Sequence, residues 1–270
     1  MVSRREWEIF PGNGVIMRFV RRSFVILCAL LFALAGCQPS GREKATKPDL
    51  KPKEGPPLFA GLRRSSYGYK EKNGDDQWWV DRAKEIAARF PGSMPTIIQI
   101  VSGYQDSDGS ANFEFKRPEG FTGPVTNMSF GKAGIDHERA LTLYDREGVM
   151  AILQIEPGNA DVADSLEIVH RQFGRHPCVI GFGIDAEWYR HKESGGTGKV
   201  IGDLDARLWV GKIRSFDPTY TLFLKHWDVR HMPPSYRSSN LWFLSDSQGF
   251  RGLPDMISDF RLWSDYVARA

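Results

Sequence analysis

Residues 179–189 (VIGFGIDAEWY) constrain the fold of this chain more than any other segment. They are typical of a buried β-strand that ends in two carboxylates, Asp185 and Glu187, which alternation along a strand places on one face. Gly183, Gly181 and Val179 continue that face with small side chains that leave space. Ile180, Phe182 and Ile184 form the other, apolar face, which we expect a helix to cover. A strand of this kind is typical of the mouth of a (β/α) barrel.

Short apolar segments alternate with amphipathic ones from residue 58 to residue 270, which favours one α/β domain with a parallel sheet. The predicted strands are 61–69, 96–103, 125–130, 149–156, 178–187, 221–226 and 241–246. The predicted helices are 75–90, 136–146, 162–173, 204–215 and 254–267. Residues 104–123 form a polar and aromatic insertion. We therefore expect a (β/α)8 TIM-like barrel that either lacks its last strand or contains one strand that the pattern does not reveal, because seven strands are one too few for a closed barrel.

The N-terminal segment 1–37 is predicted to be a targeting signal. Arg18, Arg21 and Arg22 precede a short apolar run over 24–35. The run ends in Leu-Ala-Gly-Cys at 34–37, which resembles the bacterial lipobox. The resemblance implies cleavage before Cys37 and lipid attachment to it, whereas an ordinary signal peptide and a membrane anchor are the alternatives. Met17 is the more natural start of such a signal.

Residues 38–57 are rich in Lys, Pro and Gly and nearly free of apolar side chains, so they are predicted to be a flexible linker. Together the signal and the linker predict a domain held at the bacterial cell envelope, with the membrane as a partner through the lipid anchor. Residues 1–37 also hold five arginines and two glutamates, which account for the whole formal net charge of +3. Because the rest of the chain is neutral overall, we expect no nucleic-acid partner.

Only one of the three cysteines, Cys178, lies in the predicted domain, since Cys28 and Cys37 belong to the signal. The domain is therefore expected to have no intramolecular disulfide. Cys178 is a candidate nucleophile, but its place at the start of a strand favours a small core residue.

Polar and aromatic side chains gather where the predicted strands end, which suits a carbohydrate ligand. Two adjacent acids on one face raise the pKa of one of them, and we assign Glu187 as the general acid with Asp185 tuning it. Glu156 and Asp246 are candidates for the second carboxylate that glycoside hydrolysis uses. The candidate substrate-binding residues are Tyr69, Tyr104, Gln154, Trp188, Tyr189, His226, Trp227 and Gln248.

The sequence Phe-Gly-Ile-Asp-Ala-Glu-Trp-Tyr over 182–189 resembles the Asp-x-Glu strand ends of glycoside-hydrolase barrels. It is similar to the motif of the chitinase-type family 18 and to the Asp-x-Glu strand of the family 25 lysozymes. The resemblance implies a barrel whose paired carboxylates hydrolyse glycosidic bonds in a polysaccharide.

Other functions fit the same residues. A barrel lipoprotein that binds a glycan without turnover is the main alternative, and a scaffold for envelope assembly is a third, in which Asp185 and Glu187 only cap a helix or pair with Arg190 or Lys192. We expect no cofactor, because residues 194–199 fail the phosphate-loop pattern and no dinucleotide fingerprint follows the first strand. We expect no metal, because His226 and His231 have no evident third ligand.

Overall fold

The computed structural model describes residues 58–131 and 134–269. The predicted signal, with Cys37, and the predicted linker lie outside these residues. The strands are β1 Leu58–Arg64, β2 Ser93–Tyr104, β3 Ala111–Phe113, β4 Met128–Phe130, β5 Met150–Ile155, β6 Val179–Asp185, β7 Thr221–His226 and β8 Leu241–Ser245. The helices are α1 Asp76–Ala88, α2 His137–Glu147, α3 Val162–Phe173, α4 Asp203–Phe216 and α5 Leu253–Ala268. In the described ranges, no helix has both the length and the apolar character needed to cross a membrane.

Local sequence signals set the ends of the helices. Asp75, Asp136 and Asp161 are the N-caps of α1, α2 and α3, and each side chain accepts a backbone N–H of the first turn. Gly148 ends α2 in the left-handed region, at φ 66°. The predicted start of α2 at Asp136 and its end at Gly148 are therefore confirmed.

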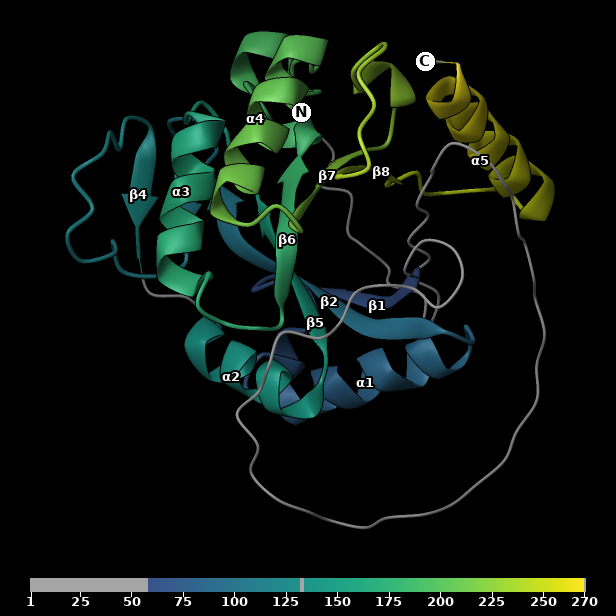
Figure 1. The fold of residues 1–270 in the computed structure, drawn as a ribbon. Coiled ribbons are helices and arrows are strands. Elements are labelled where there is room, and N and C mark those ends of the chain that lie inside the picture. Colours follow the sequence, from purple (N-terminus) through teal and green to yellow (C-terminus); the bar gives the residue numbers. More distant parts are fainter. Residues whose placement is uncertain (1–57, 132–133, 270) are drawn as a thin grey trace, which may run out of the picture.

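An eight-stranded, mostly parallel sheet forms the centre of the domain, which confirms the α/β fold class. Six strands run parallel in the order β1-β2-β5-β6-β7-β8. Helices α1 and α2 lie side by side against β1, β2 and β5, and α3 packs on α4 beside β6 and β7 (Figure 1). No strand pairing joins β8 to β1 within the described ranges, so the sheet is not closed there.

The predicted third strand does not belong to the parallel row. Only Met128–Phe130 is extended, and it pairs with β3 rather than with β2 or β5. Strand β3 in turn runs antiparallel to the last three residues of β2, because β2 continues to Tyr104 beyond the end of β1. Strand β5 pairs directly with β2, so β6 is the fourth parallel strand and not the fifth.

An irregularity at the start of β6 places two of its residues, Val179 and Ile180, on the opposite sides of the sheet from those predicted. The pairing with β5 shifts between Val179, which faces Ala151, and Gly181, which faces Ile152. As a result Ile180 joins the apolar cluster inside the sheet and Val179 joins the core under the helices, the opposite of the predicted arrangement. The space that Gly183 was expected to leave is also filled, since a Cβ on Gly183 would lie 2.0 Å from Cζ of Phe223.

The sheet has an apolar core on each side. The outer core lies between the sheet and the helices and includes Phe182 and Ile184, as predicted. The inner cluster receives a side chain from every parallel strand: Phe59, Ile98, Met150, Ile152, Ile180, Phe223, Trp242 and Leu244. Contact among all six strands on one face requires a strongly curled sheet. The inner cluster forms the floor beneath the polar strand ends.

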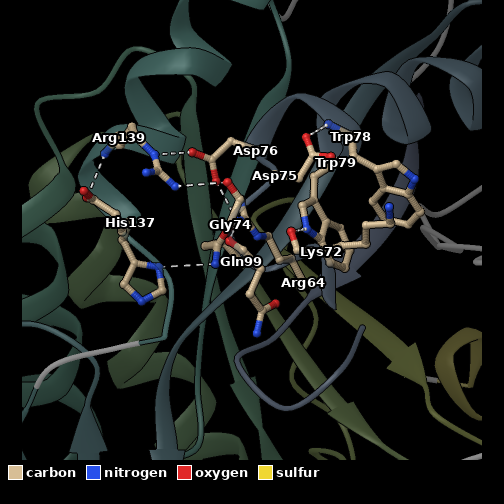
Figure 2. Close-up of polar contacts among 12 residues, drawn as sticks. Arg64, Lys72, Gly74, Asp75, Asp76, Trp78, Trp79, Gln99, His137 and Arg139 are labelled. Atoms are coloured by element: carbon tan, nitrogen blue, oxygen red, sulfur yellow. Dashed lines mark hydrogen bonds and ion pairs between the residues drawn. The ribbon is translucent and has the colours of Figure 1, made fainter. Parts of the chain in front are cut away.

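A buried ion pair fastens β1 to the helices (Figure 2). Arg64 is fully buried, and its Nη2 lies 2.6 Å from Oδ1 of Asp76 at the start of α1. Arg139 of α2 contacts the other Asp76 oxygen at 2.7 Å. The guanidinium of Arg64 also donates to the hydroxyl of Tyr144, which donates to Gln99 of β2. A buried arginine needs such partners, and they fix α1 and α2 on the sheet.

Candidate functional site

Asp185 is the last residue of β6 and lies at the centre of a polar cluster inside the curled sheet. It is 1% exposed. Its Oδ2 accepts a hydrogen bond of 3.1 Å from Nε2 of Gln154 and lies 2.9 Å from Nζ of Lys225 and 3.6 Å from Nη1 of Arg63. These partners come from β5, β7 and β1, so four parallel strands meet at this carboxylate. Burial raises the pKa of Asp185, while the charges of Lys225 and Arg63 oppose the rise.

Asp246 reaches the same cluster from the residue that follows β8. Its Oδ2 lies 2.5 Å from Nζ of Lys225, and its backbone N–H donates to the carbonyl of His226. Lys225 therefore bridges Asp185 and Asp246 across β7. These contacts place Asp246, one of the two candidates for the second carboxylate, in the polar cluster around Asp185.

Glu156 follows β5 and is held by two donors. The hydroxyl of Tyr67 donates to Oε1 at 3.0 Å, and the backbone N–H of Tyr104 donates to Oε2 at 2.9 Å. Burial and the charge of Asp185 raise the pKa of Glu156 to about 7. Glu156 therefore holds a proton more readily than an ordinary glutamate does.

Glu187 lies in the short 3-10 helix η2, Ala186–Trp188, and not on the strand. The prediction that β6 extends to Glu187 is wrong, so strand alternation does not relate the two acids. They remain electrostatically close, because burial and the charge of Asp185 raise the pKa of Glu187 to about 7. Within the described part of the chain, no side chain hydrogen-bonds the Glu187 carboxyl group. Glu187 is also more exposed than Asp185, which suits a proton donor to an incoming ligand.

Aromatic rings flank this carboxylate cluster, defined as Glu156, Asp185, Glu187 and Asp246. Tyr104 stacks on Trp188 with ring centroids 4.7 Å apart, and His191 lies 4.6 Å from Trp188. Trp227 follows β7 and is 45% exposed. Tyr104 and Trp188 are half-buried and cover part of each other's rings, so Trp227 is the more exposed flat ring near the cluster. An exposed aromatic ring beside carboxylates is suited to a ligand with both flat apolar faces and hydroxyl groups.

Other predicted ligand-binding residues have contacts elsewhere. Tyr69 packs on Trp78 and Trp79 of α1, and Tyr189 is buried against Trp209 of α4. Gln248 is exposed on the segment after β8.

Both ring nitrogens of His226 form hydrogen bonds with backbone groups. Its Nε2 bonds the carbonyl of Thr197 at 2.8 Å, and its Nδ1 accepts from the N–H of Asp228 at 2.7 Å. Burial lowers the pKa of His226 to about 4, so the ring is neutral at physiological pH. These bonds tie the loop 194–199 to β7. In the same loop, Gly198 approaches the carbonyl of Ala186, next to Glu187.

Cys178 is a buried core residue, as predicted. Its thiol lies 3.7 Å from the carbonyl of Leu141, and burial raises its pKa. Cys178 precedes the first residue of β6, so it lies at the opposite end of that strand from Asp185.

Three residues that contact the carboxylate cluster were not among the predicted site residues: Arg63, Tyr67 and Lys225. Lys225 did carry a signal, because a charged residue interrupts the apolar run of a buried strand. Arg63 continues the alternate positions Phe59 and Gly61 of β1, whereas Tyr67 lies in the segment after that strand.

Comparison of the chain with models of protein families, with curated proteins and with solved structures finds no match.

Proposed function

We propose that this chain is a glycoside hydrolase in which Glu187 is the general acid. The observation that carries the proposal is the convergence of four carboxyl groups at one end of the sheet, where Glu187 is partly exposed and has a pKa of about 7. A carboxyl group that still holds its proton near neutral pH is suited to protonate a leaving oxygen.

In the proposed reaction Glu187 gives its proton to the glycosidic oxygen as the bond from that oxygen to the anomeric carbon breaks. A water molecule forms the new bond to the anomeric carbon and gives its proton to the second carboxylate. Glu156 suits that role better than Asp246, because Glu156 is held by neutral donors whereas Asp246 lies against the ammonium of Lys225. The buried charge of Asp185 stabilises the positive charge that develops on the sugar.

The test compares Glu187→Gln with the wild-type protein on cell-wall peptidoglycan and on chitin-type polymers, with release of reducing ends as the measurement. Glu85→Gln is the matched control, because Glu85 is an exposed glutamate of α1 that pairs with Arg82 and Arg89. We expect Glu187→Gln to lose at least about 100-fold in rate and Glu85→Gln to keep the wild-type rate. Equal rates for all three proteins would refute the assignment of Glu187.

A glycan-binding protein without turnover is the second candidate. It is favoured by the open sheet. It is also favoured by the contacts of Asp185, which forms ion pairs with Lys225 and Arg63 and accepts a hydrogen bond from Gln154, so this carboxylate already has protein partners. It predicts heat of binding for a glycan in calorimetry, no release of reducing ends by the wild-type protein, and weaker binding by Trp188→Ala.

We further propose that a lipid on Cys37 anchors the domain at the cell envelope, where a polysaccharide substrate is within reach. The proposal is supported by the signal-like segment 18–37 and by the lack of apolar residues in 38–57. Metabolic labelling with a radioactive fatty acid tests it. Labelled wild-type protein and unlabelled Cys37→Ser protein are expected, and label on both would contradict this site.

A further inference from the structure

Lys225 has an unusual place for a lysine, because it is 4% exposed and lies at the C-terminal end of β7. In the sheet it pairs with Asp185 of β6 on one side and with Leu244 of β8 on the other. Its Nζ lies 2.9 Å from Asp185 and 2.5 Å from Asp246. The ammonium group thus joins two carboxylates that would otherwise repel each other in a buried place.

The two carboxylates also decide what chemistry Lys225 can perform. Burial alone would lower the pKa of Lys225, but the charges of Asp185 and Asp246 outweigh that effect and raise it. A lysine that keeps its proton has no free electron pair with which to attack a carbonyl carbon. Lys225 therefore acts as a fixed positive charge and not as a nucleophile.

We propose that Lys225 is a positioning residue that holds Asp185 and Asp246 in place and, through its charge, sets the pH range in which Glu187 can donate its proton. The inference rests on the proposed role of Glu187 as the acid. Lys225 acts through its neighbours, since its ammonium group contacts Asp185 and Asp246.

Several charged groups besides Lys225 affect the protonation of Glu187. Negative charge near Glu187 comes from Asp185 and Asp246, and positive charge comes from Lys225 and Arg63. The titratable or charged groups that face the cluster from β1, β5, β6, β7, β8 and the segments after them are Arg63, Tyr67, Glu156, Asp185, Glu187, His191, Lys225 and Asp246. Among the residues that the structure describes, only Lys225 contacts two of the carboxylates at once.

The sign of the effect follows from these charges. Burial and Asp185 raise the pKa of Glu187, and the charge of Lys225 lowers it. As long as Asp185 and Asp246 stay ionised, removal of that charge raises the pKa of Glu187 further and extends activity toward alkaline pH. A residue with a purely structural role would reduce the rate without moving the pH profile.

The test follows the carboxyl carbon of Glu187 by NMR in full-length protein labelled with 13C at the glutamate carboxyl groups. The signal is assigned by its loss in Glu187→Gln. Lys225→Gln and Lys225→Met both remove the charge, one with a polar and one with an apolar side chain, so that the test does not depend on one variant that fails to fold. Lys225→Arg keeps the charge and is the matched control.

We expect the titration midpoint of Glu187 to rise by about one pH unit in each folded neutral variant and to stay at the wild-type value in Lys225→Arg. The alkaline limb of the pH–rate profile should move by the same amount. A midpoint that does not move in Lys225→Gln or Lys225→Met, or that moves equally in Lys225→Arg, would overturn the inference. Because the NMR titration needs no substrate, its result is separate from a failure to find glycan hydrolysis.

Discussion

The ring centroids of Phe59 in β1 and Trp242 in β8 lie 5.1 Å apart, although four strands lie between β1 and β8 in the parallel row. In a flat sheet the same two strands would be separated by roughly 24 Å, since neighbouring strands lie about 4.8 Å apart. The contact therefore shows how far the sheet curls. It also closes the apolar floor on which the carboxylate cluster rests.

Trp242→Ala should remove the β8 half of this contact and leave a cavity in the inner cluster. We expect a loss of about 3–5 kcal/mol in the free energy of unfolding, measured by urea denaturation. Trp227→Ala is the control, because Trp227 is 45% exposed and its replacement should change stability by less than about 0.5 kcal/mol. A small effect of Trp242→Ala would mean that β1 and β8 do not meet in solution.

Gly198→Ala should disturb the segment that carries Glu187. A Cβ at this position would lie 2.0 Å from the carbonyl oxygen of Ala186, the residue before Glu187. Gly195→Ala is a close control, since Gly195 has a similar φ of 72°, against 80° for Gly198, but open space around its Cβ position. Both variants should lose about 1 kcal/mol from backbone strain.

Only Gly198→Ala should also show a lower rate of hydrolysis and a displaced Glu187 carboxyl signal in the NMR spectrum. If the two variants behave alike, the loop 194–199 does not support the site.

The buried pair of Arg64 and Asp76 gives a third prediction. Asp76→Ala leaves the guanidinium of Arg64 without its carboxylate, and we expect a loss of about 3–5 kcal/mol in the free energy of unfolding. Asp81→Ala on the exposed face of the same helix should cost less than about 1 kcal/mol, because it removes only a hydrogen bond from Gln77. Similar losses in the two variants would show that the pair adds little.

These residues also show what the sequence can and cannot predict. Caps such as Asp136 and Gly148 act within one turn, so local sequence was enough to place the ends of α2. The parallel direction of the main strands followed from the alternation of elements, and it brought Glu156, Asp185 and Asp246 to one end of the sheet.

The features that the sequence did not predict depend on pairing between segments that are distant along the chain. Whether Val179 or Ile180 faces inward is decided by the register against β5, which the sequence of β6 does not contain. The separation of β3 and β4 from the parallel row depends on how far β2 extends past β1. The contacts of Lys225 with Asp185 and Asp246 could not be predicted without knowing that β6 and β8 are the neighbours of β7.

The two glutamates with a pKa of about 7 predict a bell-shaped pH–rate profile. Glu187 must be protonated to act as the acid, so activity should fall as the pH rises through about 7. Glu156 must be ionised to accept a proton from water, so activity should also fall as the pH decreases through about 7. Glu187→Gln should abolish the alkaline limb, and a profile that stays flat between pH values well below and well above 7 would exclude this pair.

Tyr67→Phe should move the acid limb of the pH–rate profile without moving the alkaline limb. The Tyr67 hydroxyl donates to Glu156 and helps to hold the pKa of that carboxyl down against burial and the charge of Asp185. Without the hydroxyl group the acid limb should move to higher pH while the alkaline limb stays in place, so the bell becomes narrower. Tyr236→Phe is the matched control, because Tyr236 packs under Arg207 on the segment before β8 and should leave both limbs unchanged. Movement of the alkaline limb in Tyr67→Phe would instead assign Glu156 as the acid.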